Sequence, residues 1–439
     1  MLKLSWPTKR IFSIIVWVIA IAVRIYGATT PAQIYDIGTY EAWSRSFWVH
    51  GPMQFFSSTW SDYLPLPILS FAPISIIADL FHANFGLTFK LIHLSLELLL
   101  IALIPGFSLL PKALLLLSPA LIGDTAFWGQ VDTIPALLAL LAFTASSSSP
   151  LIYSSLFGLA VAYKPIMILL APILWIKEIK RGRYWQLPLI SMIVFFATAI
   201  PTGGFSFISH IFERISGQTG TYPFLTVNAF NLWSLLPVNT WLPDSTTILN
   251  ISGRSLGFGI FFFLTLVNLN NWRKANFSAK FALRIAATIL ICFYAFTTRM
   301  HERHLLFGLP FLTLAVATEL WLIVPLLLLT GAFTLNLYGA FYWVNHTQTW
   351  PFSQPIISLI SWISVITPLA LTFIWDWKTF ATKVKNIFSK NKVLIAILVL
   401  ATVLRFGNLV YPKELFLFLF FLQISQTVLL LVFSVHLIF

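Results

Sequence analysis

The chain has 439 residues, of which 58% are apolar, 16% aromatic and only 9% charged, and its formal net charge is +13. Soluble globular proteins carry about 25% charged residues, so this composition excludes a water-soluble enzyme, a nucleic-acid-binding module and a disordered chain. Lysine and arginine concentrate on the cytoplasmic side of any membrane protein, so the positive charge does not by itself indicate acidic partners.

Apolar runs follow one another along the whole chain. A helix needs about 20 apolar residues to span a membrane, so the sequence predicts an all-α, polytopic bundle of transmembrane helices. The first run lacks a small-residue cleavage pattern, and we expect it to be retained as the first helix. The predicted spans are 11–27, 64–83, 90–110, 111–126, 133–146, 151–163 with 165–176, 187–201, 228–240, 255–270, 281–297, 304–319, 320–343, 355–375, 393–409 and 415–435.

Clusters of lysine and arginine predict cytoplasmic loops at 177–183, 273–280 and 378–392. Successive spans should cross the membrane in alternating directions, but segment 64–83 would have to start and end on the outer side. Its prolines predict a broken helix that lies partly in the interface or re-enters. The segments that this orientation places on the outer side are 28–63, 123–132, 202–227, 298–303 and 344–351.

The first outer segment contains the acidic residues Asp36, Glu41 and Asp62. Its aromatic residues Trp43, Phe47 and Trp48 recur at helical spacing with Arg45 between them, which predicts a helix lying at the bilayer surface. The acids then belong either to a solvated loop or to a site.

Trp128, Gly129, Gln130 and Asp132 lie close together between two apolar runs. Asp132 stands where a helix N-terminus favours a carboxylate, so helix capping is the alternative to a functional role for that residue. Capping does not explain the aromatic ring and the amide, which are typical of a polar surface that binds a sugar.

Asn228 and Asn231 are three residues apart and are expected to share one face of a helix. Two amides on an apolar helix either hold it to a neighbouring helix or line a hydrophilic cavity.

Five of the six residues from Arg299 to His304 are ionisable. They cannot face lipid, where a charge near the midplane costs at least about 2.5 kcal/mol. Two guanidinium groups and an imidazole at the membrane surface predict a phosphate site, with Glu302 orienting its neighbours. Lys164, which precedes a proline that breaks its helix, is expected to join them. The second histidine of a zinc-protease motif is missing, so no histidine-based metal site is predicted.

These motifs, in this order, resemble the polytopic GT-C glycosyltransferases, and within them the prokaryotic proteins related to the eukaryotic GPI mannosyltransferase II. The resemblance covers roughly residues 10–345 and departs from the family pattern at Leu64 and Ile166. The motifs that carry it are Asp36 with Trp43 and His50-Gly51-Pro52, Asp62-Tyr63, Trp128-Gly129-Gln130-x-Asp132, Lys164-Pro165, Asn228-Ala-Phe-Asn231-Leu-Trp233 and Arg299-Met300-His301-Glu302-Arg303.

The resemblance implies transfer of a hexose, mannose above all, from a polyprenyl-phosphate donor to an acceptor hydroxyl at the outer face, with inversion. It makes Asp36 the general base, and it leaves Asp62 and Asp132 as catalytic residues that orient the sugar or hold a divalent cation, Mg²⁺ or Mn²⁺. The donor phosphate would meet Arg299, His301, Glu302, Arg303 and Lys164. The sugar or the acceptor would meet Trp128, Gln130, Asn228, Asn231, Tyr40 and Glu41.

The expected partners are the lipid bilayer and a glycan, glycolipid or protein acceptor, with no nucleic acid, and the expected location is a prokaryotic plasma membrane. The predicted organisation is a catalytic module at 1–345, a helix and polybasic loop at 346–392, and C-terminal helices at 393–439. Residues 403–414 resemble the end of the first helix of protein O-mannosyltransferases, so this tail is either a fusion remnant or a normal pair of helices.

Two other functions stay open. A transporter or flippase of lipid-linked saccharides also needs aromatic, amide and cationic side chains, although transporters place them near the midplane in repeats. A polymerase or ligase that uses a polyprenyl diphosphate is the third possibility.

Overall fold

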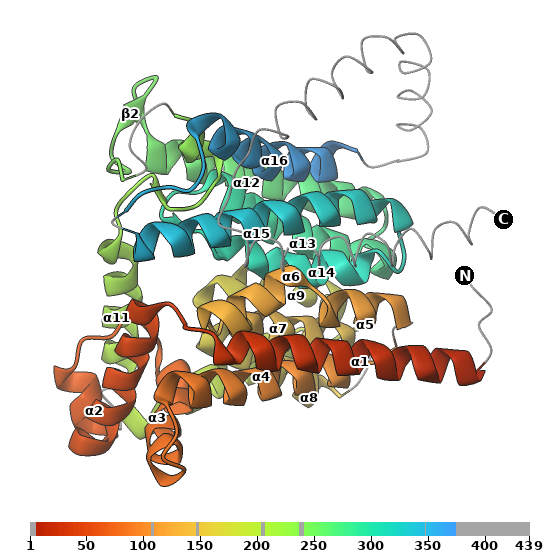
Figure 1. The fold of residues 1–439 in the computed structure, drawn as a ribbon. Coiled ribbons are helices and arrows are strands. Elements are labelled where there is room, and N and C mark those ends of the chain that lie inside the picture. Colours follow the sequence, from red (N-terminus) through yellow and green to blue (C-terminus); the bar gives the residue numbers. More distant parts are fainter. Residues whose placement is uncertain are drawn as a thin grey trace.

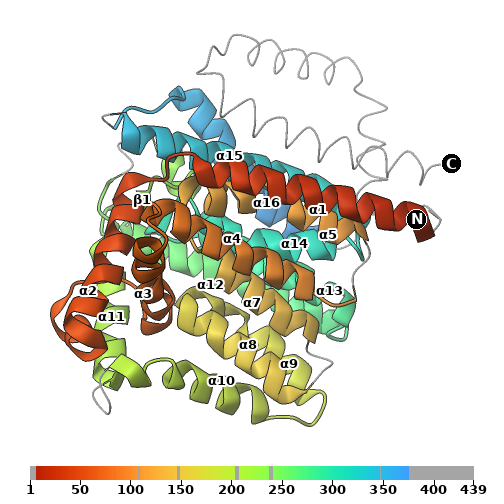
Figure 2. The same ribbon diagram turned by 60° about the horizontal axis from the view of Figure 1, so that its bottom comes forward.

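The computed structural model describes residues 6–374, apart from residues 107–108, 146–148, 203–206, 237–240 and 347. The predicted polybasic loop and the predicted helices of the tail lie outside the described residues. Within the described part the chain is almost entirely helical, and each strand has two residues. The helices pack into a bundle whose longer members run side by side (Figures 1 and 2), so the predicted all-α class is confirmed.

Six helical segments of the described residues are long and apolar enough to cross a membrane, which supports the predicted multi-pass character. The first lies within α1 (Trp6–Thr29). Three coincide with α4 (Phe85–Leu103), α13 (Ala279–Phe296) and α16 (Gln354–Phe373), and one contains α15 (Ile323–Asn345). The sixth joins α5 (Leu109–Leu116), α6 (Pro119–Ile122) and the π-helix η1 (Gly123–Trp128).

Shorter helices lie in predicted spans 64–83, 133–146, 151–163 with 165–176, 187–201 and 304–319. They are α3 (Pro65–Leu80), α7 (Thr133–Thr144), α8 (Pro150–Tyr163), α9 (Ala171–Ile179), α10 (Gln186–Ala197) and α14 (Leu309–Ala315). Predicted span 255–270 is helical as α12 (Gly253–Lys274) but is not among the six long apolar segments. The predicted break at Lys164 is confirmed: α8 ends at Tyr163, and the 3₁₀-helix η3 (Pro165–Leu170) follows because proline has no N–H to continue the α-helix.

Helices α2 (Ile34–Ser58), α3 and α11 (Phe207–Thr221) gather at one end of the bundle, across the direction of α1 (Figures 1 and 2). We call this the site end. The helix predicted around these aromatic residues is present as α2: Trp43 and Phe47 pack into the protein core, whereas Trp48 is exposed. The prediction that prolines break segment 64–83 is wrong, because α3 starts at Pro65 and continues past Pro73.

The predicted span 228–240 is wrong. Its described part holds only the 3₁₀-helix η6 (Leu232–Leu235), and Asn228 and Asn231 lie outside any helix. Asn228 has a left-handed backbone with φ 61°, and the Asn231 side chain accepts a hydrogen bond from the backbone N–H of Trp233. Such local side-chain bonds compete with helix formation, which the apolar composition of the segment conceals.

Two pairs of short strands complete the fold. Strand β1 (Thr226–Val227) pairs in parallel with β4 (Met300–His301), and β2 (Thr247–Ile248) forms a hairpin with β3 (Ile251–Ser252). The first pair joins two distant segments at the site end.

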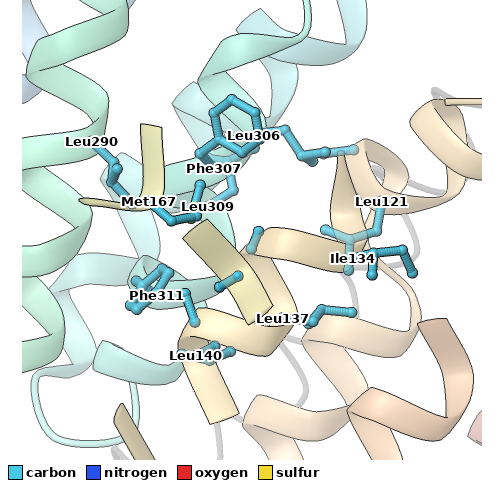
Figure 3. Close-up of a cluster of buried hydrophobic side chains, with 14 of the residues drawn as sticks. Leu121, Ile134, Leu137, Leu140, Met167, Leu290, Leu306, Phe307, Leu309 and Phe311 are labelled. Atoms are coloured by element: carbon cyan, nitrogen blue, oxygen red, sulfur yellow. The ribbon is translucent and has the colours of Figure 1, made fainter. Parts of the chain in front are cut away.

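The core lies directly behind the charged Arg299–His304 segment. Figure 3 shows Leu306, Phe307 and Phe311 in one buried cluster with Leu121 and Leu137. Lipid is as apolar as leucine, so within a membrane close packing, rather than exclusion of water, holds such helices together. The one-turn helix η7 (His304–Gly308) therefore connects the charged segment to a tightly packed support.

Candidate functional site

A cavity of about 780 Å³ lies at the site end, and we call it the polar cavity. Its wall combines tryptophan and tyrosine rings with amides and charged groups. The predicted site residues that line it are Asp36, Tyr40, Asp62, Trp128, Asn228, His301, Glu302 and Arg303.

A second cavity of about 320 Å³ shares five lining residues with the first, and we call it the cationic cavity. Three phenylalanines, Phe258, Phe293 and Phe307, give it an apolar wall, while Lys164, Arg299 and Arg303 supply positive charge. The shared residues are Asp62, Tyr63, Tyr222, His301 and Arg303. Apolar surface beside cations is suited to a phosphate carried on a lipid.

Asp36 lies in the first turn of α2 and is held by two donors from another part of the chain. Its Oδ2 atom accepts the indole N–H of Trp128 at 2.7 Å and the amide N–H of Gln130 at 2.5 Å. Among the described residues, no hydrogen bond reaches the other oxygen, Oδ1. The carboxylate is therefore fixed through one oxygen while the other is available to a ligand in the polar cavity.

The turn after η1 brings both donors to Asp36. Gly129 has φ 86°, and the backbone carbonyl of Asp124 accepts from the N–H groups of Gly129 and Gln130. A Cβ atom at Gly129 would lie 3.0 Å from a side-chain carbon of Ile37, so this close approach to α2 also favours glycine. Each residue of the Trp-Gly-Gln motif thus contributes: Trp128 and Gln130 donate to Asp36, and Gly129 permits the turn. Gln130, which was predicted to line the site, is buried behind the polar cavity instead.

Asp132 is fully buried between two cations. Its Oδ1 atom lies 2.7 Å from Lys164 Nζ, and its Oδ2 atom lies 3.3 Å from Arg303 Nε. Arg303 also meets Glu302, with 2.8 Å between Nη1 and Oε1. Asp132 lines neither cavity, so its position favours holding the two cations over direct catalysis.

These positions do not fit a divalent metal. The carboxylate of Asp132 is already compensated by Lys164 and Arg303, and no group of three or more histidine, cysteine, aspartate and glutamate side chains that could hold a metal occurs among the described residues. Mg²⁺ and Mn²⁺ are bound by carboxylate and water oxygens, and a site beside two cations repels them.

Pairing of β1 with β4 brings Asn228 beside the charged segment. Val227 is opposite His301 in the register, and a further bridge joins Asn228 to His301. Arg299, like Asn228, has a left-handed backbone, with φ 65°. Strained conformations of this kind persist where the surroundings hold them and are frequent at functional sites.

Arg299 lines the cationic cavity but not the polar cavity, and its Nε atom donates to Asp244 at 2.7 Å. Nothing in the sequence around Asp244 signals this pairing across 55 residues. The aspartate is buried, so it fixes the guanidinium close to the cavity.

Besides Gln130, two further residues predicted to line the site, Glu41 and Asn231, line neither cavity. Glu41 pairs with Arg45 at 2.9 Å on the exposed side of α2, outside both cavities. Asn231 is fully buried, and its amide donates to the carbonyl of Tyr294 at 3.1 Å. Asn231 therefore holds the loop to α13, which is the structural alternative that the sequence left open.

Burial shifts the pKa values of three side chains that line the polar cavity. It lowers the pKa of His301 well below its usual value, helped by the charges of Arg303 and His304, so this imidazole is neutral at pH 7. Burial raises the pKa of Asp62 although Lys164 opposes it, and it raises the pKa of Glu302 although Arg303 opposes it. The permanent positive charge at the site comes from lysine and arginine.

Sequence reasoning missed two tyrosines of the shared wall. Tyr63 places its hydroxyl 3.1 Å from that of Tyr40 and 3.5 Å from Lys164 Nζ. The ring of Tyr222 lies edge-on to His301, with 4.9 Å between centroids. For Tyr63, the one feature of the sequence that could have indicated a role at the site is its position directly after Asp62.

No family model matches the chain, and no curated protein matches it in sequence.

Proposed function

We propose that the protein is a membrane glycosyltransferase that moves a hexose, mannose above all, from a polyprenyl-phosphate donor to an acceptor hydroxyl. The observation that carries the proposal is Asp36: two N–H donors hold one oxygen, and the other is left for a substrate in the polar cavity. A general base needs this kind of fixed carboxylate within hydrogen-bonding reach of the attacking hydroxyl.

The cationic cavity supports a lipid-linked phosphate as the leaving group. Its phenylalanines suit the first part of a polyprenyl chain, and Arg303 borders both cavities. Cations placed where negative charge develops stabilise the transition state more than the ground state. Lys164 and Arg299 add to this charge from the same wall.

In the proposed reaction the acceptor oxygen attacks the anomeric carbon on the face opposite the phosphate. Its proton passes to Asp36 Oδ1 as the new C–O bond forms, and the bond to the phosphate oxygen breaks with its electron pair leaving on the phosphate. One displacement inverts the anomeric carbon. Asp62, which borders both cavities, is placed to orient the sugar between them.

A transporter or flippase of lipid-linked saccharides and a polyprenyl-diphosphate polymerase or ligase are the competing functions. The gathering of the described charged cavity residues at one end of the bundle favours an enzyme that works at a membrane face over a transporter with a midplane site. A diphosphate donor would need more positive charge than a monophosphate donor.

The test compares Asp36→Asn with Asp79→Asn, whose carboxylate lies exposed on α3 and pairs with Arg45. Purified protein in lipid nanodiscs receives polyprenyl-phosphate [³H]mannose, with methyl α-mannoside, a mannosylated glycolipid or a serine-containing peptide as acceptor. Asp36→Asn is expected to lose transfer and acceptor-independent hydrolysis of the donor, and Asp79→Asn to keep both. Transfer by a folded Asp36→Asn protein excludes the base, and no turnover of any monophosphate donor favours the competing functions.

A further inference from the structure

Glu97 is a fully buried carboxylate in the middle of α4, one of the helices apolar enough to cross a membrane. Both of its oxygens have partners. Oε1 accepts from Arg24 of α1 at 2.6 and 2.9 Å, and Oε2 accepts the hydroxyl of Thr125 at 2.6 Å. A charge in this environment is expensive, so its retention calls for a role.

Thr125 belongs to η1, the π-helix that ends at Trp128. Its hydroxyl also lies 3.0 Å from that of Thr133 at the start of α7. The hydroxyl of Thr125 therefore ties both ends of the Trp-Gly-Gln turn to Glu97, and this turn carries the two donors of Asp36.

The same turn also contacts the residues that precede Asp36. The backbone carbonyl of Trp128 accepts from the N–H of Gln33 at 3.0 Å, and the Gln33 side chain accepts from the N–H of Asp36. Displacement of η1 would move the indole donor and the cap of α2 together.

π-Helices are rare, and they occur mostly as single turns at functional sites. The sequence of Gly123–Trp128 does not by itself favour a π-helix over an α-helix. Side-chain contacts are therefore needed to hold the π-helical hydrogen-bond pattern of η1. Arg24 anchors Glu97 in turn, because its Nη1 atom donates to the carbonyl of Leu116 at 2.6 Å, and Leu116 is the last residue of α5.

We propose that Glu97 and Thr125 are positioning residues, which hold η1 so that the N–H groups of Trp128 and Gln130 point at Asp36. They touch no substrate and act through the turn. This inference rests on the proposed function for its kinetic consequence, but its structural consequence can be measured without any substrate.

The structural readout is the indole N–H resonance of Trp128 in protein labelled with ¹⁵N-tryptophan, assigned with Trp128→Phe. In wild-type protein we expect a downfield resonance, because the N–H donates to a carboxylate, and in Asp36→Asn we expect it to move upfield. Thr125→Val, which keeps the shape but removes the hydroxyl, should move it in the same direction. Thr125→Ser, which keeps the hydroxyl, should leave the resonance in place.

The matched control is Thr288→Val. Thr288 is equally buried in α13, but among the described residues its hydroxyl bonds only to the carbonyl of Arg284 in its own helix. This variant is expected to leave the Trp128 resonance unchanged. If Thr125→Val does not fold, Thr125→Ala and Thr288→Ala replace the pair.

The kinetic readout separates positioning from a general loss of stability. Thr125→Val should lower kcat by at least about tenfold with the donor KM nearly unchanged, since small misplacement of catalytic groups costs up to about 100-fold. Thr125→Ser should restore kcat.

An unchanged Trp128 resonance in Thr125→Val overturns the inference. An equal loss of kcat in Thr125→Val and Thr288→Val also overturns it. If the wild-type protein transfers no sugar from any donor, the proposed function fails while the resonance still decides the role of Thr125.

Discussion

Lys164 Nζ and Asp132 Oδ1 lie 2.7 Å apart, which joins the break between α8 and η3 to the start of α7. Asp132 contacts Arg303 with its other oxygen, so one buried carboxylate orders two cations that line the cationic cavity. The geometry of the proposed phosphate site therefore depends on a residue that does not line it.

Asp132→Asn is expected to weaken both the fold and the donor site. Removing one partner of a buried ion pair costs about 3–5 kcal/mol, because it leaves charges without compensation. We expect a lower Tm and a higher donor KM, measured by thermal unfolding and by initial rates. Glu319→Gln breaks the buried pair with Arg284 and is the control, with a lower Tm but an unchanged KM. An unchanged donor KM in Asp132→Asn contradicts the ordering role.

Arg299→Gln is expected to raise the donor KM by at least about tenfold, since a hydrogen bond to a charged group contributes about 1.5–3 kcal/mol. The acceptor KM should stay nearly constant, because Arg299 lines only the cationic cavity. Initial rates at varied donor and acceptor concentrations measure both. The control is Arg273→Gln, because Arg273 is exposed in the last turn of α12 and lines neither cavity. Equal effects of Arg299→Gln on the donor KM and the acceptor KM would count against a phosphate role.

Trp128→Phe keeps the aromatic packing but removes one of the two donors to Asp36. We expect kcat to fall by about 10- to 100-fold, from the energy of one charge-assisted hydrogen bond, with little change in either KM. Trp272→Phe is the matched control, because this buried indole donates to the carbonyl of Ser278 in the loop before α13. Equal loss of kcat in both variants would show that packing rather than the donor matters.

Transfer is expected to continue after removal of divalent cations. Lys164 and Arg303 already compensate the predicted metal ligand Asp132, which leaves Asp62 alone as an anionic ligand of the predicted pair. Initial rates after EDTA treatment and gel filtration should equal those with added Mg²⁺ or Mn²⁺. A loss of rate that either ion restores would show that the metal predicted from the sequence binds after all.

The helical class and the main apolar segments could be predicted because hydropathy over some 20 residues is a local property. The roles of single polar residues could not, because they depend on pairing across the chain. Asn228 and Asn231 fit a helix by spacing, yet the strand pairing with Met300 and His301 takes their segment out of helical geometry. Asp36 and Trp128 were each singled out by sequence, but their contact spans 92 residues.

Glu41 is a residue that the sequence assigned to the site although the structure places it outside the polar cavity. It lies between Asp36 and Trp43 in sequence, and one turn of helix decides which of these side chains face the polar cavity. Glu41 pairs instead with Arg45, which also pairs with Asp79 of α3. Composition marks acidic residues as informative in an apolar chain, but only the helix phase and the neighbouring α3 separate a site carboxylate from a surface ion pair.

The neutral state of His301 predicts a pH dependence of stability. Its pKa lies below the unfolded value of about 6.5, mainly because burial disfavours the cation. Above that value both states are neutral. As pH falls below it, the unfolded chain binds a proton that the folded protein does not, so the free energy of unfolding decreases by up to about 1.4 kcal/mol per pH unit.

His301→Gln removes this contribution while keeping a polar side chain. We therefore expect wild-type protein to lose more thermal stability than His301→Gln between pH 7.5 and pH 5.5. The neighbouring titratable groups Asp62, Glu302 and His304 remain in both proteins, so the difference between the two curves isolates His301. Parallel curves would mean that the imidazole of His301 is protonated in the folded protein as readily as in the unfolded chain. His301 would then count among the cations of the proposed phosphate site.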